Sequence, residues 1–216
     1  MLSIPRIVFE ASFFVVIFAG VVGLVRFRHL QPPLRYLLSL VLFTAVIEVV
    51  SRIRSNHYQS NLFLLPLDTL VEFGLLAGLY RQALSPSAVS RWLPAVAGLF
   101  ALVSLFSYRE QAAIEQFNTV QRFAESLLVL GLVLLYFYKV IRELAIIRLE
   151  REPMFWISVG LLVYFAGNLF VFVFSNYIIR QSSAVSTQLW GIHALLYTGL
   201  YALYAWALWI KPSTPK

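Results

Sequence analysis

The sequence contains no cysteine, and charged residues make up only 12% of its 216 positions. The absence of cysteine excludes disulfide bonds, zinc–thiolate sites, iron–sulfur clusters and a cysteine nucleophile. With so few charges and 60% hydrophobic residues, the composition lies outside that of soluble globular domains and is typical of a membrane protein. We therefore treat residues 1–216 as a single transmembrane domain.

The motifs of common catalytic and cofactor sites are also missing. The sequence has no HExxH, no pair of histidines at helical spacing and no GxSxG. Retinal binding requires a lysine in the middle of the last helix, whereas Lys211 follows that helix. We expect no metal and no cofactor. The net charge of +7 reflects arginines in loops and not a basic stripe with interleaved aromatics, so we expect no nucleic-acid partner.

Long apolar stretches fill most of the chain. A helix needs about 20 mostly apolar residues to cross a bilayer, and Arg, Pro or polar clusters separate seven stretches of roughly that size. These stretches are residues 7–26, 35–54, 61–80, 91–107, 117–138, 154–178 and 187–209. The pattern predicts an all-α polytopic membrane protein, a bundle of seven transmembrane helices.

The distribution of Lys and Arg predicts the orientation of this bundle. Of the 17 such residues, 11 fall in the loops after the first, third and fifth stretches and in the C-terminal tail. Cytoplasmic loops carry an excess of Lys and Arg. We therefore predict a multi-pass protein of a bacterial inner membrane, with the N-terminus outside and the C-terminus in the cytoplasm.

Polar and ionisable side chains within the predicted spans fall in their outer halves. They are Glu48, Asp68, Glu72, Arg122, Glu125, Asn168, His193 and Tyr197. A charge within the membrane is tolerated only when it faces the bundle interior or a wet cavity. Helical spacing also places Asp68 and Glu72 on one face of the third span. We predict that all eight residues bind a ligand in one outward-facing acidic cavity.

Other interpretations of these residues stay open. Glu48 and Arg52 would form an ion pair near the outer interface, where arginine reaches water. Arg122 and Glu125 would form a second pair of the same kind. His193 would be a hydrogen-bonded packing residue, and the tyrosines that follow it would be core packing or an interfacial belt.

Residues 153–176, PMFWISVGLLVYFAGNLFVFVFSN, resemble a stretch in the membrane-sensing modules that precede histidine kinases in many bacteria. The resemblance covers the spans in general and is specific in this stretch. It implies signal input from outside or from the lipid phase, and output through the cytoplasmic end. The chain stops at WIKPSTPK without a kinase, so either the output partner is a separate protein or the function is not signalling.

These features favour a receptor-like, non-enzymatic protein that binds a small or lipid-like ligand and signals through its cytoplasmic side. The inner halves of the spans are almost purely apolar, which favours sensing over passage. The alternative is an integral-membrane lipid-modifying enzyme, or a small-solute or ion carrier, that uses the same cavity.

Two further segments predict contacts with the bilayer or with other proteins. Residues 139–152 form an amphipathic cytoplasmic extension, which would lie at anionic headgroups or dock a signalling partner. Gly74 and Gly78 form a GxxxG motif, which predicts close helix packing inside the chain or a homodimer.

Overall fold

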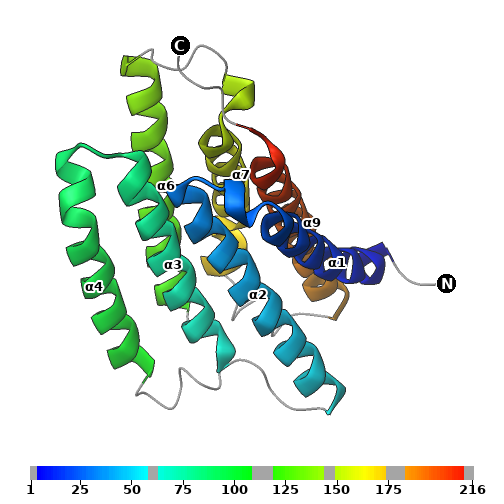
Figure 1. The fold of residues 1–216 in the computed structure, drawn as a ribbon. Coiled ribbons are helices and arrows are strands. Elements are labelled where there is room, and N and C mark those ends of the chain that lie inside the picture. The colour runs from blue at the N-terminus through cyan, green and yellow to red at the C-terminus, as the bar shows by residue number, and fades with distance from the viewer. Residues whose placement is uncertain (1–3, 58–62, 109–118, 144–148, 174–182, 212–216) are drawn as a thin grey trace.

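The computed structural model describes residues 4–57, 63–108, 119–143, 149–173 and 183–211, and Figure 1 shows their course. Within these ranges the chain is entirely helical, as predicted, and each of the seven predicted stretches contains an α-helix. The helices are α1 (Ile4–Val25), α2 (Pro32–Asn56), α3 (Leu64–Ala83), α4 (Ala88–Tyr108), α6 (Thr119–Glu143), α7 (Pro153–Val173) and α9 (Ser183–Trp209). Two short 3-10 helices, η1 (Phe27–His29) and η2 (Leu149–Arg151), precede α2 and α7.

Proline marks the start of two of these helices. The first residue of α2 is Pro32 and the first of α7 is Pro153. Proline suits this position because its fixed φ matches the helix and its missing N–H would have no partner there. The backbone of Gln31, which precedes α2, is extended, so the chain enters that helix directly after η1.

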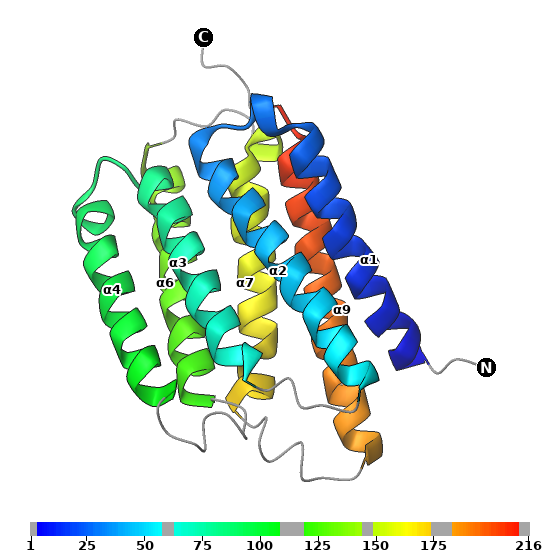
Figure 2. The same ribbon diagram turned by 60° about the horizontal axis from the view of Figure 1, so that its bottom comes forward.

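Consecutive helices run in opposite directions and form a bundle (Figure 2). The contacts run from α1 to α2, α3, α6, α7, α9 and back to α1, while α4 lies on the outside against α3. We call the end at which α1 begins the N-terminal end of the bundle, and the end at which α9 finishes the C-terminal end. Helices that are far apart in sequence, such as α3 and α6, therefore enclose a common interior.

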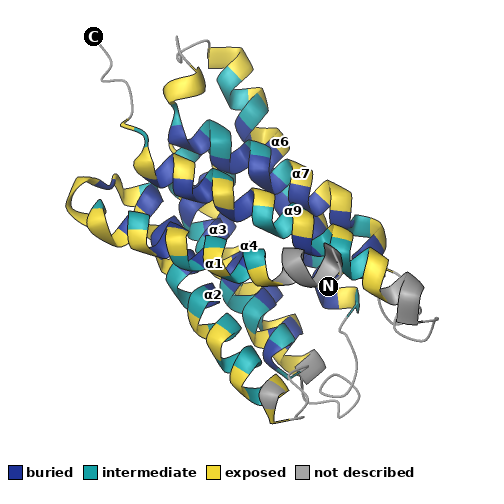
Figure 3. Ribbon diagram, turned by 90° about the vertical axis from the view of Figure 1, so that its right-hand side faces the viewer, coloured by how far each residue is buried: buried dark blue, intermediate teal, exposed yellow. Residues whose placement is uncertain are grey.

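Figure 3 shows buried residues alternating with exposed ones along the helices. Large apolar side chains remain exposed on the outer surface, including Phe14, Leu99, Leu134 and Phe170, each more than half accessible. Apolar exposure on this scale is unusual for a protein surrounded by water. Within the described residues, α2, α4, α6 and α7 are long and apolar enough to cross a membrane. The fold is therefore that of a helical membrane protein.

Several glycines allow close packing between helices, and Gly78 and Gly167 are two of them. A Cβ at Gly78 would lie 2.5 Å from Cε1 of Tyr36 on α2, and one at Gly167 would lie 2.8 Å from Cδ1 of Leu196 on α9. Both glycines thus permit contacts inside the chain. Gly74, the other residue of the GxxxG motif, is exposed and has open space beside it within the described structure.

The predicted amphipathic extension lies partly in α6, which continues to Glu143. Val140 is half-buried and Ile141 is exposed, whereas Leu144 and Ile147 lie outside the described residues. Lys139 contributes to the fold, because its Nζ donates hydrogen bonds to the carbonyl oxygens of Ala83 (3.0 Å) and Ser85 (2.9 Å). A cation at this position satisfies carbonyl groups at the C-terminus of α3.

Candidate functional site

A buried ionic cluster joins α3 to α6 in the half of the bundle nearer its N-terminal end. Nη1 of Arg122 lies 2.6 Å from Oε2 of Glu72 and 2.7 Å from Oε2 of Glu125, and its Nη2 lies 2.9 Å from Oδ2 of Asp68. The Arg122 side chain is 9% exposed and that of Glu125 is completely buried. One guanidinium therefore holds three carboxylates from two helices.

Helical spacing explains why these four side chains meet. Asp68 and Glu72 are four residues apart on α3, and Arg122 and Glu125 are three apart on α6, so each pair lies on one helix face. The packing of α3 against α6 turns the two faces toward each other. The predicted pair of Arg122 and Glu125 is confirmed, and the structure adds the bonds across to α3.

The cluster contains more carboxylates than cations. Fully ionised, its three acids and one arginine would carry a formal charge of −2. In addition, Oε1 of Glu125 has no hydrogen-bond partner among the described residues. Burying an uncompensated charge in an apolar environment is very unfavourable. Protons or a bound cation must therefore balance this excess.

A cavity of about 390 Å³ lies beside the cluster, at the N-terminal end between α1, α2 and α9. It is lined by Glu10, Ser12, Glu48, Ser51, Arg52, Ser55, His193, Ala194 and Tyr197. Nη1 of Arg52 donates to Oε2 of Glu10 at 2.9 Å, and its guanidinium lies over the ring of Phe13 at 4.2 Å. Glu48, the partner of Arg52 that the sequence predicts, lies in the same wall and interacts with Arg52 electrostatically, while the Glu10 bond joins Arg52 to α1.

The structure does not place all eight predicted site residues in one cavity; most belong either to the cavity wall or to the ionic cluster. Glu48, His193 and Tyr197 line the cavity, as the sequence predicts. The four residues of the ionic cluster, on α3 and α6, are not among the side chains that line it. The eighth residue, Asn168 on α7, contacts the cavity wall, because its Oδ1 lies 3.1 Å from Nδ1 of His193.

The sequence prediction omitted part of the cavity wall. Ser51, Arg52 and Ser55 follow Glu48 at spacings of three, four and seven residues, the pattern of a single helix face. That signal was present in the sequence. The participation of Ser12 and Glu10 depends on α1 packing between α2 and α9, which no local pattern reveals.

The tyrosines of α9 are part of the core and not an interfacial belt. Tyr201 is 2% exposed and Tyr204 is completely buried. The ring centroids of Tyr197 and Tyr201 are 4.6 Å apart, and those of Tyr201 and Tyr204 are 5.2 Å apart. The hydroxyl of Tyr201 also donates to Oγ1 of Thr44 on α2 at 2.9 Å. A row of phenol groups thus extends from the cavity into the bundle.

The interior near the C-terminal end also contains buried hydroxyl groups. Tyr80 on α3 and Ser158 on α7 are fully buried, and their hydroxyl oxygens are 2.8 Å apart. Tyr136 on α6 is 4% exposed and lies near Tyr80, with ring centroids 6.4 Å apart. The inner half is almost purely apolar in the sequence, and among its few hydroxyl groups those of Tyr80, Tyr136 and Ser158 face inward.

A second cavity, of about 290 Å³, opens at the C-terminal end. Its wall includes Tyr136, Lys139, Glu143 and Glu152, together with Gln31, Pro33, Ala83, Val140 and Met154. Burial raises the pKa of the Glu152 carboxyl, although a hydrogen bond from the backbone N–H of Met154 acts in the opposite direction. Carboxylates therefore line a cavity at each end of the bundle.

Comparison with known proteins provides no relative. No protein-family model, curated protein or solved structure matches this chain. Among the residues that the structure describes, no group of three His, Asp or Glu side chains is arranged to hold a metal ion. The function must therefore be argued from the two cavities and the polar groups between them.

Proposed function

We propose that this protein is a receptor-like membrane protein that binds a small cationic or hydroxyl-bearing ligand, or a lipid headgroup, at its N-terminal end. The observation that carries this proposal is the cavity of about 390 Å³ lined by Glu48, His193 and Tyr197. Small-molecule sites have volumes of about 300 to 1,000 Å³. The cavity is at the lower end of this range, which suits a ligand of few atoms.

The chemistry of the wall favours a cation. Glu10 and Glu48 supply two carboxylates against the single guanidinium of Arg52, and the serine hydroxyls and Tyr197 add hydrogen-bonding groups. The ionic cluster behind the wall brings a further excess of carboxylates. A protonated amine or a polyol would find acceptors on several sides, and the Tyr197 ring offers a face for a cation.

We further propose that the chain crosses a bacterial inner membrane seven times, with its N-terminal end outside. The alternating directions of the helices support this topology, because they gather the loops that are rich in Lys and Arg at the C-terminal end. The chain has no cysteine, so single cysteines at exposed His57 and Ala88 provide a test. An impermeant maleimide applied to intact cells should label H57C but not A88C; the reverse pattern would contradict this orientation.

Signal output would pass through the C-terminal end of the bundle. His193 and Tyr197 lie on α9, so a ligand that contacts them would bias the packing of a helix that crosses the whole bundle. Residues 139–152 would then present a docking surface to a cytoplasmic partner, as in the sensor modules that residues 153–176 resemble. A homodimer through Gly74 remains compatible with its exposed position, although Gly78 already contacts Tyr36.

Ligand-induced thermal stabilisation tests the binding site. The purified protein is heated with choline, ethanolamine, spermidine or glycerol, and its unfolding temperature is compared with that of Glu48→Gln. We expect stabilisation by at least one of these compounds, and its loss in E48Q. Glu143→Gln, at the opposite end of the bundle, is the matched control and should respond like the wild type. The assignment fails if no compound stabilises the wild type, or if E48Q responds fully.

A further inference from the structure

The buried polar atoms without a hydrogen-bond partner in the described parts of the chain include Oε1 of Glu125, the hydroxyl of Tyr204 and the hydroxyl of Tyr136. Leaving such an atom without a partner is unfavourable, and native proteins retain few of them. A phenylalanine at either tyrosine position would fill nearly the same space without that cost. The retained hydroxyls therefore call for a role other than packing.

The three atoms lie at successive depths in the bundle, within a longer series of hydroxyl groups. Counted at about 1.5 Å per residue from the C-terminal end of α9, Tyr197 lies about 18 Å deep, Tyr201 about 12 Å and Tyr204 about 8 Å. By the same measure Ser158 on α7 lies about 8 Å deep and Tyr80 on α3 about 5 Å. From Tyr197 to Tyr80 the depth falls from about 18 to about 5 Å, toward the C-terminal end at which the second cavity opens.

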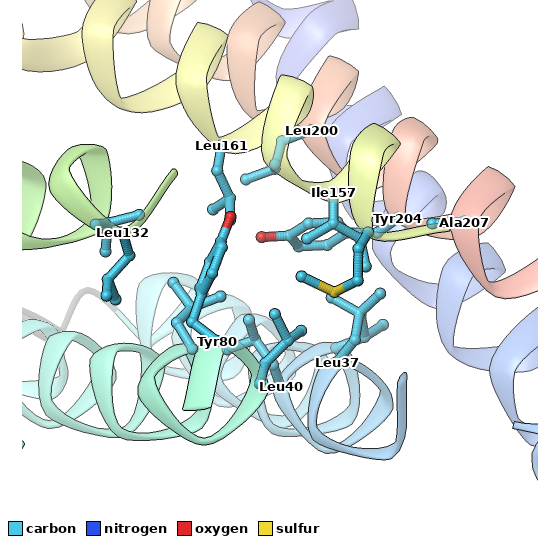
Figure 4. Packing of buried hydrophobic residues seen from close by; sticks show 14 of the residues in the cluster. Leu37, Leu40, Tyr80, Leu132, Ile157, Leu161, Leu200, Tyr204 and Ala207 are labelled. Atoms are coloured by element: carbon cyan, nitrogen blue, oxygen red, sulfur yellow. The ribbon is translucent and has the colours of Figure 1, made fainter. Parts of the chain in front are cut away.

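Measured contacts connect most neighbours in this series. Tyr197 lines the first cavity beside Glu48, and the ring contacts of 4.6 and 5.2 Å lead from it to Tyr201 and Tyr204. Figure 4 shows the hydroxyls of Tyr204 and Tyr80 directed into the same interior region. From Tyr80 the series continues to Ser158, at 2.8 Å, and by ring contact to Tyr136 in the wall of the second cavity.

An apolar shell surrounds the middle of the series. Leu37, Leu40, Ile157 and Leu161 are at most 1% exposed and lie around the two tyrosines in Figure 4. The two cavities share no lining residue. A hydrated ion or a solute would have to displace this packing, whereas a proton needs only oxygen atoms that accept and donate in turn.

We propose that the buried hydroxyl series conducts protons between the two ends of the bundle. A carboxylate at the first cavity, such as Glu48, takes up a proton from water and passes it to the hydroxyl oxygen of Tyr197. Each hydroxyl oxygen accepts one proton and releases its own to the next group, so it is neutral again after the transfer. Glu152 or Glu143 finally receives a proton and releases it to water at the second cavity.

This transfer needs no oxidant, reductant or second substrate, because one proton enters and one leaves. Rotation of each O–H bond then restores the starting orientation. The raised pKa of Glu152 suits a group at the end of such a series, since the carboxyl holds a proton closer to neutral pH than an exposed glutamate does. The proposal is independent of any ligand in the first cavity.

Proton flux into liposomes tests the proposal. The full chain is reconstituted into vesicles that contain K⁺ and a pH-sensitive dye, and valinomycin is added to set an inside-negative potential. We expect faster internal acidification than in protein-free vesicles. Tyr204→Phe and Tyr80→Phe should each slow the protein-dependent rate at least about tenfold, the effect of about 1.4 kcal/mol of added barrier. Tyr138→Phe, at an exposed tyrosine of α6, should leave the rate unchanged.

Folding is monitored separately by the unfolding temperature and by gel filtration. Y204F should fold normally, because the hydroxyl it removes has no partner in the described structure. Wild-type flux no faster than in protein-free vesicles would overturn the proposal, and so would unchanged flux in Y204F and Y80F. Either result leaves the ligand site untouched, because that site is tested by thermal stabilisation and E48Q. Conversely, failure of every ligand would not alter the expected flux.

Discussion

Replacement of Arg122 by methionine tests whether the ionic cluster is held together by charge compensation. The change keeps most of the side-chain volume but leaves Asp68, Glu72 and Glu125 without their shared cation. Removing one partner of a buried ion pair costs about 3 to 5 kcal/mol, because the remaining charge stays uncompensated. For a domain of about this size, each kcal/mol shifts the unfolding temperature by about 2 to 4 °C. We therefore expect Arg122→Met to lower it by about 6 to 20 °C.

A second variant separates charge from packing. In R122M/E72Q/E125Q two of the three carboxylates are also neutral, so the triple variant should unfold at a higher temperature than R122M alone, despite its additional substitutions. Glu10→Gln serves as the control, since the Glu10 and Arg52 side chains are 53% and 35% exposed and such pairs contribute at most about 1 kcal/mol. The reasoning is refuted if R122M unfolds within a few degrees of the wild type, or if the triple variant is the less stable one. Thermal unfolding in detergent, followed by gel filtration, measures all three variants.

The remaining predictions concern helix packing and pH. Gly78→Ala should destabilise the protein by about 1 to 3 kcal/mol through overpacking against Tyr36, whereas Gly74→Ala, with open space beside it, should not. Equal unfolding temperatures for the two variants would contradict this contact. The pKa of Glu152 is raised above 4.5 in the folded chain. Above pH 4.5 the carboxyl therefore ionises more readily in the unfolded chain than in the folded one, and the folded chain loses stability as the pH rises. At about pH 8, Glu152→Gln should therefore unfold at a higher temperature than the wild type, and at about pH 4 the two should unfold at the same temperature. A difference in unfolding temperature that is equal at both pH values would refute this linkage.

The sequence predicts the secondary structure well because bilayer-length apolar segments and their polar breaks are local features. The segments RFRHLQPPLR and RQALSPSAVSR, for example, each contain the end of one observed helix or the start of the next, with the break between them. The observed helix ends differ from the predicted ones by a few residues where part of a predicted loop is helical. Ala88 begins α4 three residues before the predicted start, and α6 continues to Glu143, past the predicted end at residue 138.

The candidate site is less predictable because it depends on which helices are neighbours. Spacing places Asp68 with Glu72 on one helix face and Arg122 with Glu125 on another, and both faces are as expected. No periodicity in the sequence indicates that these faces meet, or that Glu48 lies on the opposite side with α1 and α9. The phenol row is missed for a different reason. Tyrosine suits apolar packing and lipid interfaces equally well in sequence, and only the burial of Tyr201 and Tyr204 separates the two.

The two proposals meet at Tyr197. Its side chain lines the cavity with Glu48 and His193, and its ring packs 4.6 Å from Tyr201, the next member of the buried row. A ligand that contacted Tyr197 on the cavity wall would therefore touch the group at which the proposed hydroxyl series begins. A bound ligand could then change the orientation of the Tyr197 phenol and so affect the buried tyrosines, without a large movement of any helix.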